Sequence, residues 1–260
     1  MGNNGNPAQR LFDIAKDGNK YTEDRSFNVW AEVFNIPESG NKGFTRDEEL
    51  VVFSRINQCR KLVDEVESLL LLNTSLPEET KKVYLRPFPK LRTLFCKPSQ
   101  LYRSHKQNFT LDQTDFTLLE LIIHAVEGVY KEKVADENEL KDLVDEIQNL
   151  YEQVIDLEID KNLKRILLDL LKIMENAIHE YRIRGVERLH EAVEQLVGIY
   201  IVNEKVINNS KIEEVGKIKK ILNKFQSVYS FSADTVQLLG SGEAVKTAGE
   251  IITRLLGSGQ

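Results

Sequence analysis

Hydrophobic residues recur every three or four positions over most of the chain, which is typical of helices with one apolar face. After Thr45 one such stripe consists of Val52, Ile56, Cys59, Val63, Val66 and Leu70. Similar stripes cover residues 116–130, 140–157, 163–181 and 186–200. The breaks between the later stripes are short, so neighbouring helices should run antiparallel. The pattern predicts an all-α protein in which residues 111–229 form an antiparallel helical bundle.

Helix starts are indicated by pairs with capping-box spacing, in which a hydroxyl residue precedes Glu or Gln by three positions. The pairs are Thr45 with Glu48, Ser75 with Glu78, Thr110 with Gln113, and Ser210 with Glu213. Asp136 is placed to cap a further helix. Gly185 permits a tight turn between two helical stripes.

The prolines divide the chain, because all 6 lie at or before Pro98. Since proline disrupts a helix interior, the stretch after Pro98 can form long helices. Residues 196–202 are rich in β-branched residues and are compatible with a strand, but they continue a helical stripe, so we favour a helix. Residues 81–106 contain three prolines and should form broken helical pieces.

This organisation predicts a flexible N-terminus over residues 1–25 and an N-terminal helical part over residues 26–110. Residues 230–260 are predicted to form a connector and a separable amphipathic C-terminal helix. In that helix the face at residues 242–257 is lined by small and apolar side chains: Ala244, Ala248, Ile251, Ile252 and Leu255. Small residues allow close helix approach, so we interpret this face as an interface. Membrane insertion through residues 242–257 is the alternative, although only Lys246 and Arg254 supply positive charge there.

Charge is distributed unevenly along the chain. Its 35 Lys and Arg and 41 Asp and Glu residues give a net charge of -6. Residues 1–110 hold 17 basic and 14 acidic residues, whereas residues 111–200 hold 10 and 21. The basic side chains are concentrated in an acid-free stretch at residues 81–106, which consists of Lys81, Lys82, Arg86, Lys90, Arg92, Lys97, Arg103 and Lys106.

Aromatic residues are interleaved with this basic stretch: Tyr84, Phe88, Phe95 and Tyr102. Basic side chains attract phosphates and aromatic faces stack on bases, so the composition suits single-stranded nucleic acid. It also suits an anionic membrane surface or an acidic protein. The alternative is a structural role, in which the segment docks on the acidic bundle of the same chain and its aromatics enter the core.

The motif search indicates no metal site and no cofactor. There is no HExxH, CxxC pair, glycine-rich phosphate loop or GxSxG. Cys59 and Cys96 follow apolar patterns and are interpreted as buried thiols, which fits a reducing cytoplasm. No signal peptide or spanning segment is recognised in the sequence.

One pair of residues has a spacing associated with catalysis. Arg184 and His190 are separated by five residues, which loosely resembles the Arg-x4-6-His motif of HEPN-type helical ribonucleases. The resemblance implies that the arginine stabilises phosphate charge and the histidine acts in acid–base cleavage. Gly185 stands where that family usually has a polar residue. If Gly185 forms a turn, the two side chains lie on different helices.

These observations favour a non-enzymatic cytoplasmic interaction or regulatory protein, such as an adaptor, that works through helix faces and a basic patch. It would bind a protein partner or a second copy of itself and would need no small-molecule cofactor. The alternatives are an RNA-binding protein or HEPN-like ribonuclease using Arg184 and His190, and a membrane-active effector using residues 242–257.

Overall fold

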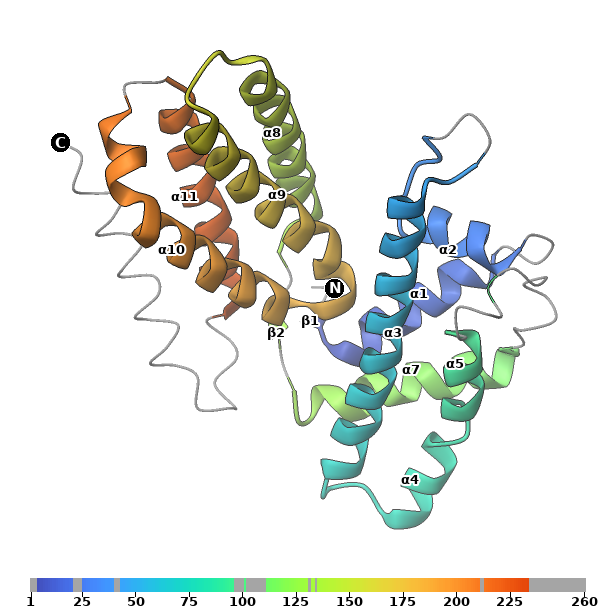
Figure 1. Ribbon diagram of the computed structural model, residues 1–260. Coiled ribbons are helices and arrows are strands. Elements are labelled where there is room, and N and C mark those ends of the chain that lie inside the picture. Colours follow the sequence, from blue (N-terminus) through green and yellow to red (C-terminus); the bar gives the residue numbers. More distant parts are fainter. Residues whose placement is uncertain are drawn as a thin grey trace. The chain divides into compact units, whose positions relative to one another are not determined.

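The computed structural model shows an all-α protein, which confirms the predicted fold class (Figure 1). It describes residues 4–20, 25–39, 43–95, 101, 111–130, 132–133, 135–210 and 213–233. The chain forms two compact units. The N-terminal unit is Gly5–Lys131, and the C-terminal unit is Glu132–Gln260 together with Met1–Asn4. Each unit is described by itself.

The N-terminal unit packs several helices around a buried tryptophan. Its helices are α1 (Pro7–Gly18), α2 (Ser26–Val33), α3 (Arg46–Leu72), α4 (Glu78–Tyr84), α5 (Phe88–Leu94) and α7 (Gln113–Glu127). Helix α1 packs against α2, α3 and α7, and α3 also packs against α5. Trp30 is fully buried, and its ring centroid lies 5.1 Å from that of Phe95. The broken pieces expected around the prolines are confirmed by α4 and α5.

Helix α1 corrects the prediction of a flexible N-terminus over residues 1–25. The Asn6 side chain accepts a hydrogen bond from the Gln9 amide at 2.8 Å, and Pro7 occupies the first helical turn, where a proline is tolerated. Leu11 and Ile14 are fully buried. The polar first six residues therefore precede a core helix.

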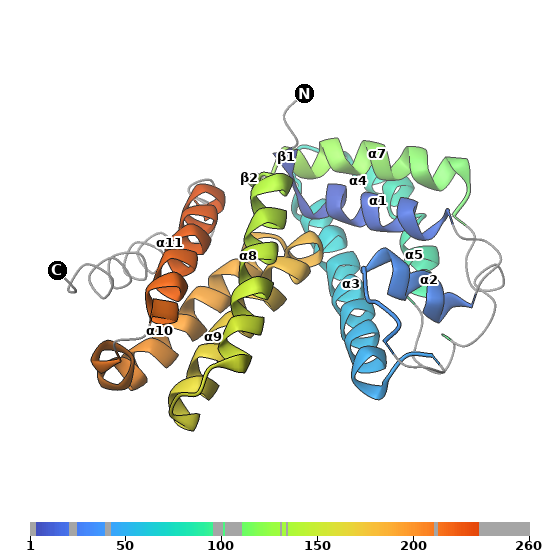
Figure 2. The ribbon, with the colours of Figure 1, turned by 90° about the horizontal axis from the view of Figure 1, so that it is seen from above.

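The C-terminal unit is an antiparallel bundle. Its elements are β2 (Glu132–Lys133), α8 (Glu137–Asp156), α9 (Lys161–Arg184), α10 (Val186–Asn209) and α11 (Glu213–Ala233). Helix α9 packs between α8 and α10, and α11 packs against both α8 and α10 (Figure 2). Fully buried residues such as Leu167, Met174 and Leu189 form the core. The short strand β1 (Asn4–Gly5) pairs with β2.

Helix α7 lies outside this bundle, although the sequence analysis grouped residues 111–130 with it. Leu119 and Val126 of α7 are fully buried. They belong to the N-terminal unit, where α7 packs against α1, α3 and α4. The bundle therefore begins at α8. Residues 196–202 are helical, as favoured from their stripe, because they continue α10.

The helix starts agree in part with the predicted capping pairs. Thr45 and Glu48 form the predicted box at α3. At α7 the box is formed by Asp112 and Asp115 instead of the predicted Thr110 pair.

Two other predicted capping pairs differ from the structure. Helix α4 follows Pro77 without a side-chain cap, and the Ser75 hydroxyl bonds to Asn73 instead. Ser210 is the C-terminal cap residue of α10. By contrast, Asp136 caps α8 as predicted. The errors arise because nearby Asp, Asn and Pro residues compete for the same short connections.

Candidate functional site

Arg184 and His190 lie on either side of a tight turn. Arg184 is the last residue of α9, and His190 lies in the second turn of α10. Gly185 joins the two helices with φ 61° and ψ −150°, a conformation that side-chain-bearing residues rarely adopt. The predicted turn is therefore present, and the two candidate residues lie on different helices.

The charge of Arg184 is balanced by a carboxylate of the same chain. Its Nη1 donates to Glu191 Oε2 at 2.8 Å, and its Nη2 donates to Glu191 Oε1 at 2.5 Å. Glu187 lies 3.7 Å from Nη2. The hydrogen bond to Glu191 raises the pKa of Arg184 above its ordinary value, and the nearby glutamates act in the same direction. A phosphate would have to compete with Glu191 for this guanidinium.

His190 has a different partner. Its Nε2 lies 3.4 Å from Glu194 Oε1, one turn further along α10. Arg184 therefore contacts Glu191, whereas His190 contacts Glu194. This arrangement supports a structural role at the α9–α10 turn more directly than it supports a shared catalytic centre.

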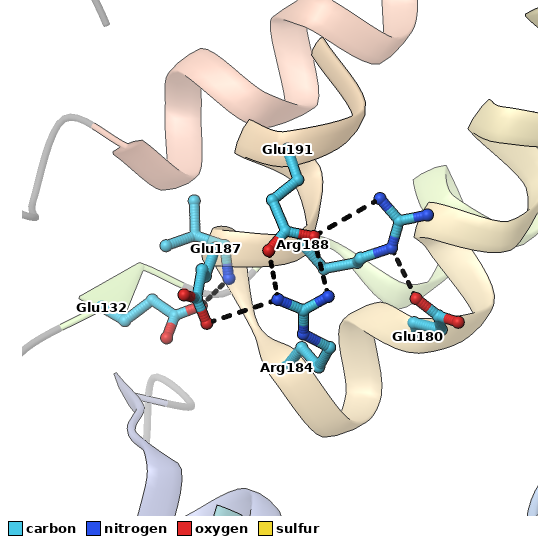
Figure 3. A network of polar contacts seen from close by, with 7 residues as sticks. Glu132, Glu180, Arg184, Glu187, Arg188 and Glu191 are labelled. Carbon is cyan, nitrogen blue, oxygen red and sulfur yellow. Dashed lines mark hydrogen bonds and ion pairs between the residues drawn. The ribbon is translucent and has the colours of Figure 1, made fainter. Parts of the chain in front are cut away.

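The same turn contains a larger polar network that the sequence analysis missed (Figure 3). The side chain of Arg188 is almost buried, and its Nε donates to Glu180 Oε2 at 2.5 Å. Its Nη1 is also buried, makes no hydrogen bond in the described part of the chain and lies 3.9 Å from Glu191 Oε2. The network thus ties the last turns of α9 to the first turns of α10.

Glu132 completes the network from the other end of the unit's sequence. The N-cap position of α10 is Gly185, which has no side chain to cap the helix. The buried carboxylate of Glu132 accepts a hydrogen bond from the Val186 amide at 2.7 Å instead. A carboxylate at a helix N-terminus is stabilised by the helix dipole. The anion-binding position of α10 is therefore filled by the protein itself.

The described cations of the 81–106 segment are mostly paired within the N-terminal unit. Lys81 and Lys82 pair with Glu78 and Glu79, each one turn earlier on α4. The remaining described cation of the segment outside α5, Arg86, is exposed and has no ion pair among the described residues. Lys97, Arg103 and Lys106 lie outside the described residues.

The two cations on α5 pair with carboxylates of other helices. Lys90 Nζ lies 2.6 Å from Asp115 Oδ2, and the hydrogen bond to Asp115 raises the pKa of Lys90. Arg92 donates to Glu67 and to Asp64, and the bond to Glu67 raises the pKa of Arg92. These pairs are long-range within the sequence, and they hold α5 against α3 and the start of α7.

The aromatic residues between these cations face the core. Phe88 and Phe95 are almost completely buried, and Phe95 packs on Trp30. Tyr84 is partly exposed, and Tyr102 lies outside the described residues. The segment's buried aromatics are therefore unavailable for stacking on bases without opening the core.

An exposed apolar strip lies on the outer face of α10. Ile201, Val202 and Val206 are 52%, 82% and 39% exposed. They lie on the side opposite the buried Leu196 and Tyr200. We call these three exposed residues the α10 strip. Sequence periodicity could not separate the strip from the core stripe, because both consist of β-branched and aliphatic residues.

Other apolar side chains are exposed in the N-terminal unit. They lie at the start and end of α3, on α4 and on α7, and they are Leu50, Val51, Leu71, Leu72, Val83 and Leu121. In the described part of the C-terminal unit, Ile155 on α8 is the further large apolar residue that is exposed. The α10 strip is distinguished by Val202, whose exposed fraction of 82% is the largest among these residues.

Neither a metal cluster nor a membrane-crossing helix is found in the described ranges. No group of three or more His, Cys, Asp or Glu residues there has metal-binding geometry. None of the described helices is long and apolar enough to cross a membrane. The predicted interface residues Ala244, Ala248, Ile251, Ile252 and Leu255 lie outside the described residues.

Comparison with known proteins gives no relative: no protein family, curated protein or solved structure matches this chain.

Proposed function

We propose that the protein is a non-enzymatic, cytoplasmic interaction protein that binds a protein partner through the outer face of α10. The observation that carries this proposal is the α10 strip, with Val202 82% exposed on a helix whose other face forms the bundle core. Contiguous exposed apolar residues rimmed by polar ones are characteristic of interaction surfaces. Exposed polar residues neighbour the strip on α10: Glu194, Lys205 and Asn209.

The polar networks support the same proposal. Arg184 and His190 are engaged by separate glutamates, and Arg188 is held by Glu180. These contacts give the α9–α10 turn a rigid geometry. A rigid turn fixes the direction of α10 and therefore the position of the strip. We therefore propose that the network holds α10, and with it the α10 strip, in a fixed position.

RNA binding through the 81–106 segment is the alternative function. Its support is the exposed side chain of Arg86 and the three basic residues outside the described ranges. Against it, Lys90 and Arg92 pair with carboxylates of α3 and α7, and Phe88 and Phe95 are core residues. We therefore favour the interaction role.

The proposal is tested by photo-crosslinking in the cells that make the protein. A p-benzoylphenylalanine at position 202 should yield a discrete adduct with another protein. The matched control places the same crosslinker at Asn176, an exposed polar position on α9. If position 202 yields no adduct, the proposed partner surface on α10 is contradicted. The same holds if positions 202 and 176 yield the same adducts.

A further inference from the structure

Beside the α10 strip, α10 offers room for another helix. Gly198 lies one turn before Val202 on the outer face, and a Cβ added at Gly198 would meet nothing within 4 Å. Small residues at such positions let a second helix approach closely. The outer face of α10 thus has open space at Gly198 followed by large apolar side chains at Ile201 and Val202.

The end of α11 brings the following chain to the start of this helix. Helix α11 runs antiparallel to α10, and its end lies beside β2 (Figure 1). Glu132 of β2 in turn bonds to the Val186 amide at the start of α10. The chain after Ala233 therefore continues from the end of the bundle where α10 begins. A following helix that returned along the bundle would run parallel to α10.

In that parallel direction, the sequence pattern of residues 242–257 matches the outer face of α10. If Ile252 is level with Val202, Ala248 is level with Gly198. The larger residues then coincide as well, because Ile251 is level with Ile201 and Leu256 with Val206. Small residues thus meet the open part of the face, and large apolar residues meet the strip.

The connecting chain is long enough for this register. With 252 beside 202, residue 242 is level with Ala192, about 9 Å along α10 from Val186 at 1.5 Å per residue. The sideways step between packed helices is about 10 Å. The connector of residues 234–241 spans up to about 27 Å when extended. No part of the bundle has to move.

We infer that residues 242–257 dock in cis on the outer face of α10 and cover the α10 strip, in competition with the protein partner. This inference rests on the proposed function, to which it adds regulation: the partner binds when the segment is displaced. Ile251, Ile252 and Leu256 supply the contact with the strip, and Ala248 supplies the close approach at Gly198.

The test uses the purified full chain with p-benzoylphenylalanine at position 202. After irradiation, peptide mass spectrometry should map the adduct to residues 242–257 of the same molecule. A mixture of isotope-labelled and unlabelled chains separates adducts within one chain from adducts between two chains. Adducts only between chains would overturn the inference in favour of a second copy, and the absence of adducts to 242–257 would overturn it outright.

Matched variants of the segment test whether the intramolecular adduct depends on its apolar face. Ile252→Glu places a carboxylate against the strip and should lower the intramolecular yield by about tenfold or more. Thr253→Glu adds the same charge about 100° around a helix from Ile252, outside the proposed contact, and should leave the yield unchanged. Circular dichroism checks that both chains keep the bundle. Equal yields from the two variants would contradict the docking.

The two proposals fail in different ways. In cells, Ile252→Glu should increase the adduct between position 202 and the partner. If the partner adduct forms but the purified chain shows no intramolecular adduct, the docking is wrong and the interaction role stands. If no partner adduct forms even with Ile252→Glu, the interaction role is wrong, whatever the purified chain shows.

Discussion

Arg188 illustrates how a single buried charge can fix a helix junction. Its guanidinium is almost buried between α9 and α10, and Glu180 is its closest carboxylate. A buried charge is costly unless it is paired, so the loss of one partner is penalised more than the pair itself contributes. The Arg188–Glu180 pair therefore specifies how α9 and α10 meet.

Removal of the charge on Glu180 should destabilise the C-terminal unit. We expect Glu180→Gln to lower the free energy of unfolding by about 2–4 kcal/mol, because Arg188 loses its buried counter-ion. Glu187→Gln is the matched control, since Glu187 is exposed and 3.7 Å from Arg184, and it should change stability by less than about 0.5 kcal/mol. Urea unfolding measures both. Equal losses of stability in the two variants would show that the burial of Arg188 does not determine the loss.

The start of α7 makes a pH-dependent contribution. The Asp112 side chain accepts the backbone N–H of Asp115 and pairs with Lys90, and both interactions lower the pKa of Asp112. A carboxyl whose pKa is lower in the folded state stabilises the fold above its unfolded pKa, and this contribution disappears as the pH falls.

We therefore expect Asp112→Asn to reduce stability at neutral pH and to flatten its decline in acid. Asparagine still caps the helix, so the change isolates the charge. The difference between the two chains should begin to shrink near the ordinary carboxyl pKa of about 3.9 and should vanish only below the lowered pKa of folded Asp112. Thermal unfolding from pH 7 to pH 2.5 measures this. A constant difference across that range would contradict the linkage.

At the scale of elements, Gly185 is the position at which backbone conformation is most restrictive. Its φ of 61° and ψ of −150° suit glycine, whereas Gly216 lies inside α11 with open space around it. We expect Gly185→Ala to destabilise the chain by about 1–3 kcal/mol. Gly216→Ala should stabilise it by about 0.5–1 kcal/mol, since alanine is the better helix former. Thermal unfolding distinguishes the two, and a neutral Gly185→Ala would contradict the strained turn.

The helices were predictable from the sequence where the residues of one apolar stripe are the buried residues of the helix. Val52, Cys59 and Val66 are fully buried on α3, as their spacing predicts. Helix α1 was missed, because a polar, glycine-rich start precedes the cap at Asn6. The cap of α10 was not predictable, because Glu132 reaches Val186 across 54 residues of sequence.

At the scale of the whole molecule, the net charge of -6 conceals where charge is neutralised. The sequence alone is compatible with a basic stretch that faces a partner and with one that faces carboxylates of the same chain. Lys90 and Arg92 form ion pairs with carboxylates of α3 and of the start of α7, which are 22 to 28 residues away in the sequence. Pairings over such separations depend on tertiary packing, so they could not be derived from composition.

This neutralisation predicts weak RNA binding. We expect the purified chain to bind single-stranded RNA no more tightly than non-specific proteins do, roughly 10⁻⁴ M, with a shallow dependence on salt. Fluorescence anisotropy at several salt concentrations measures the affinity and its slope. Tight binding with a steep slope that is lost in Arg86→Gln would instead establish the basic segment as a nucleic-acid interface.

The boundary between the two units, at residues 131 and 132, could not be predicted from the hydrophobic periodicity. The reason is that α7 has the same kind of apolar stripe as the bundle helices. The sequence also did not show which apolar residues are exposed. Val202 and Tyr200 are both apolar in sequence, yet Val202 is exposed and Tyr200 is buried. The candidate surface therefore required the three-dimensional arrangement, whereas the fold class did not.

The role of α10 as a partner surface is tested most directly by the size of the assembly that contains the protein in fresh extracts of its own cells. The tagged wild-type chain should elute from a size-exclusion column well above its own 29.9 kDa. Val202→Glu should shift it to the monomer position, whereas Asn176→Glu, which adds the same charge to an exposed site on α9, should not. A wild-type chain that elutes as a monomer, or a Val202→Glu chain that stays in the assembly, would contradict the account.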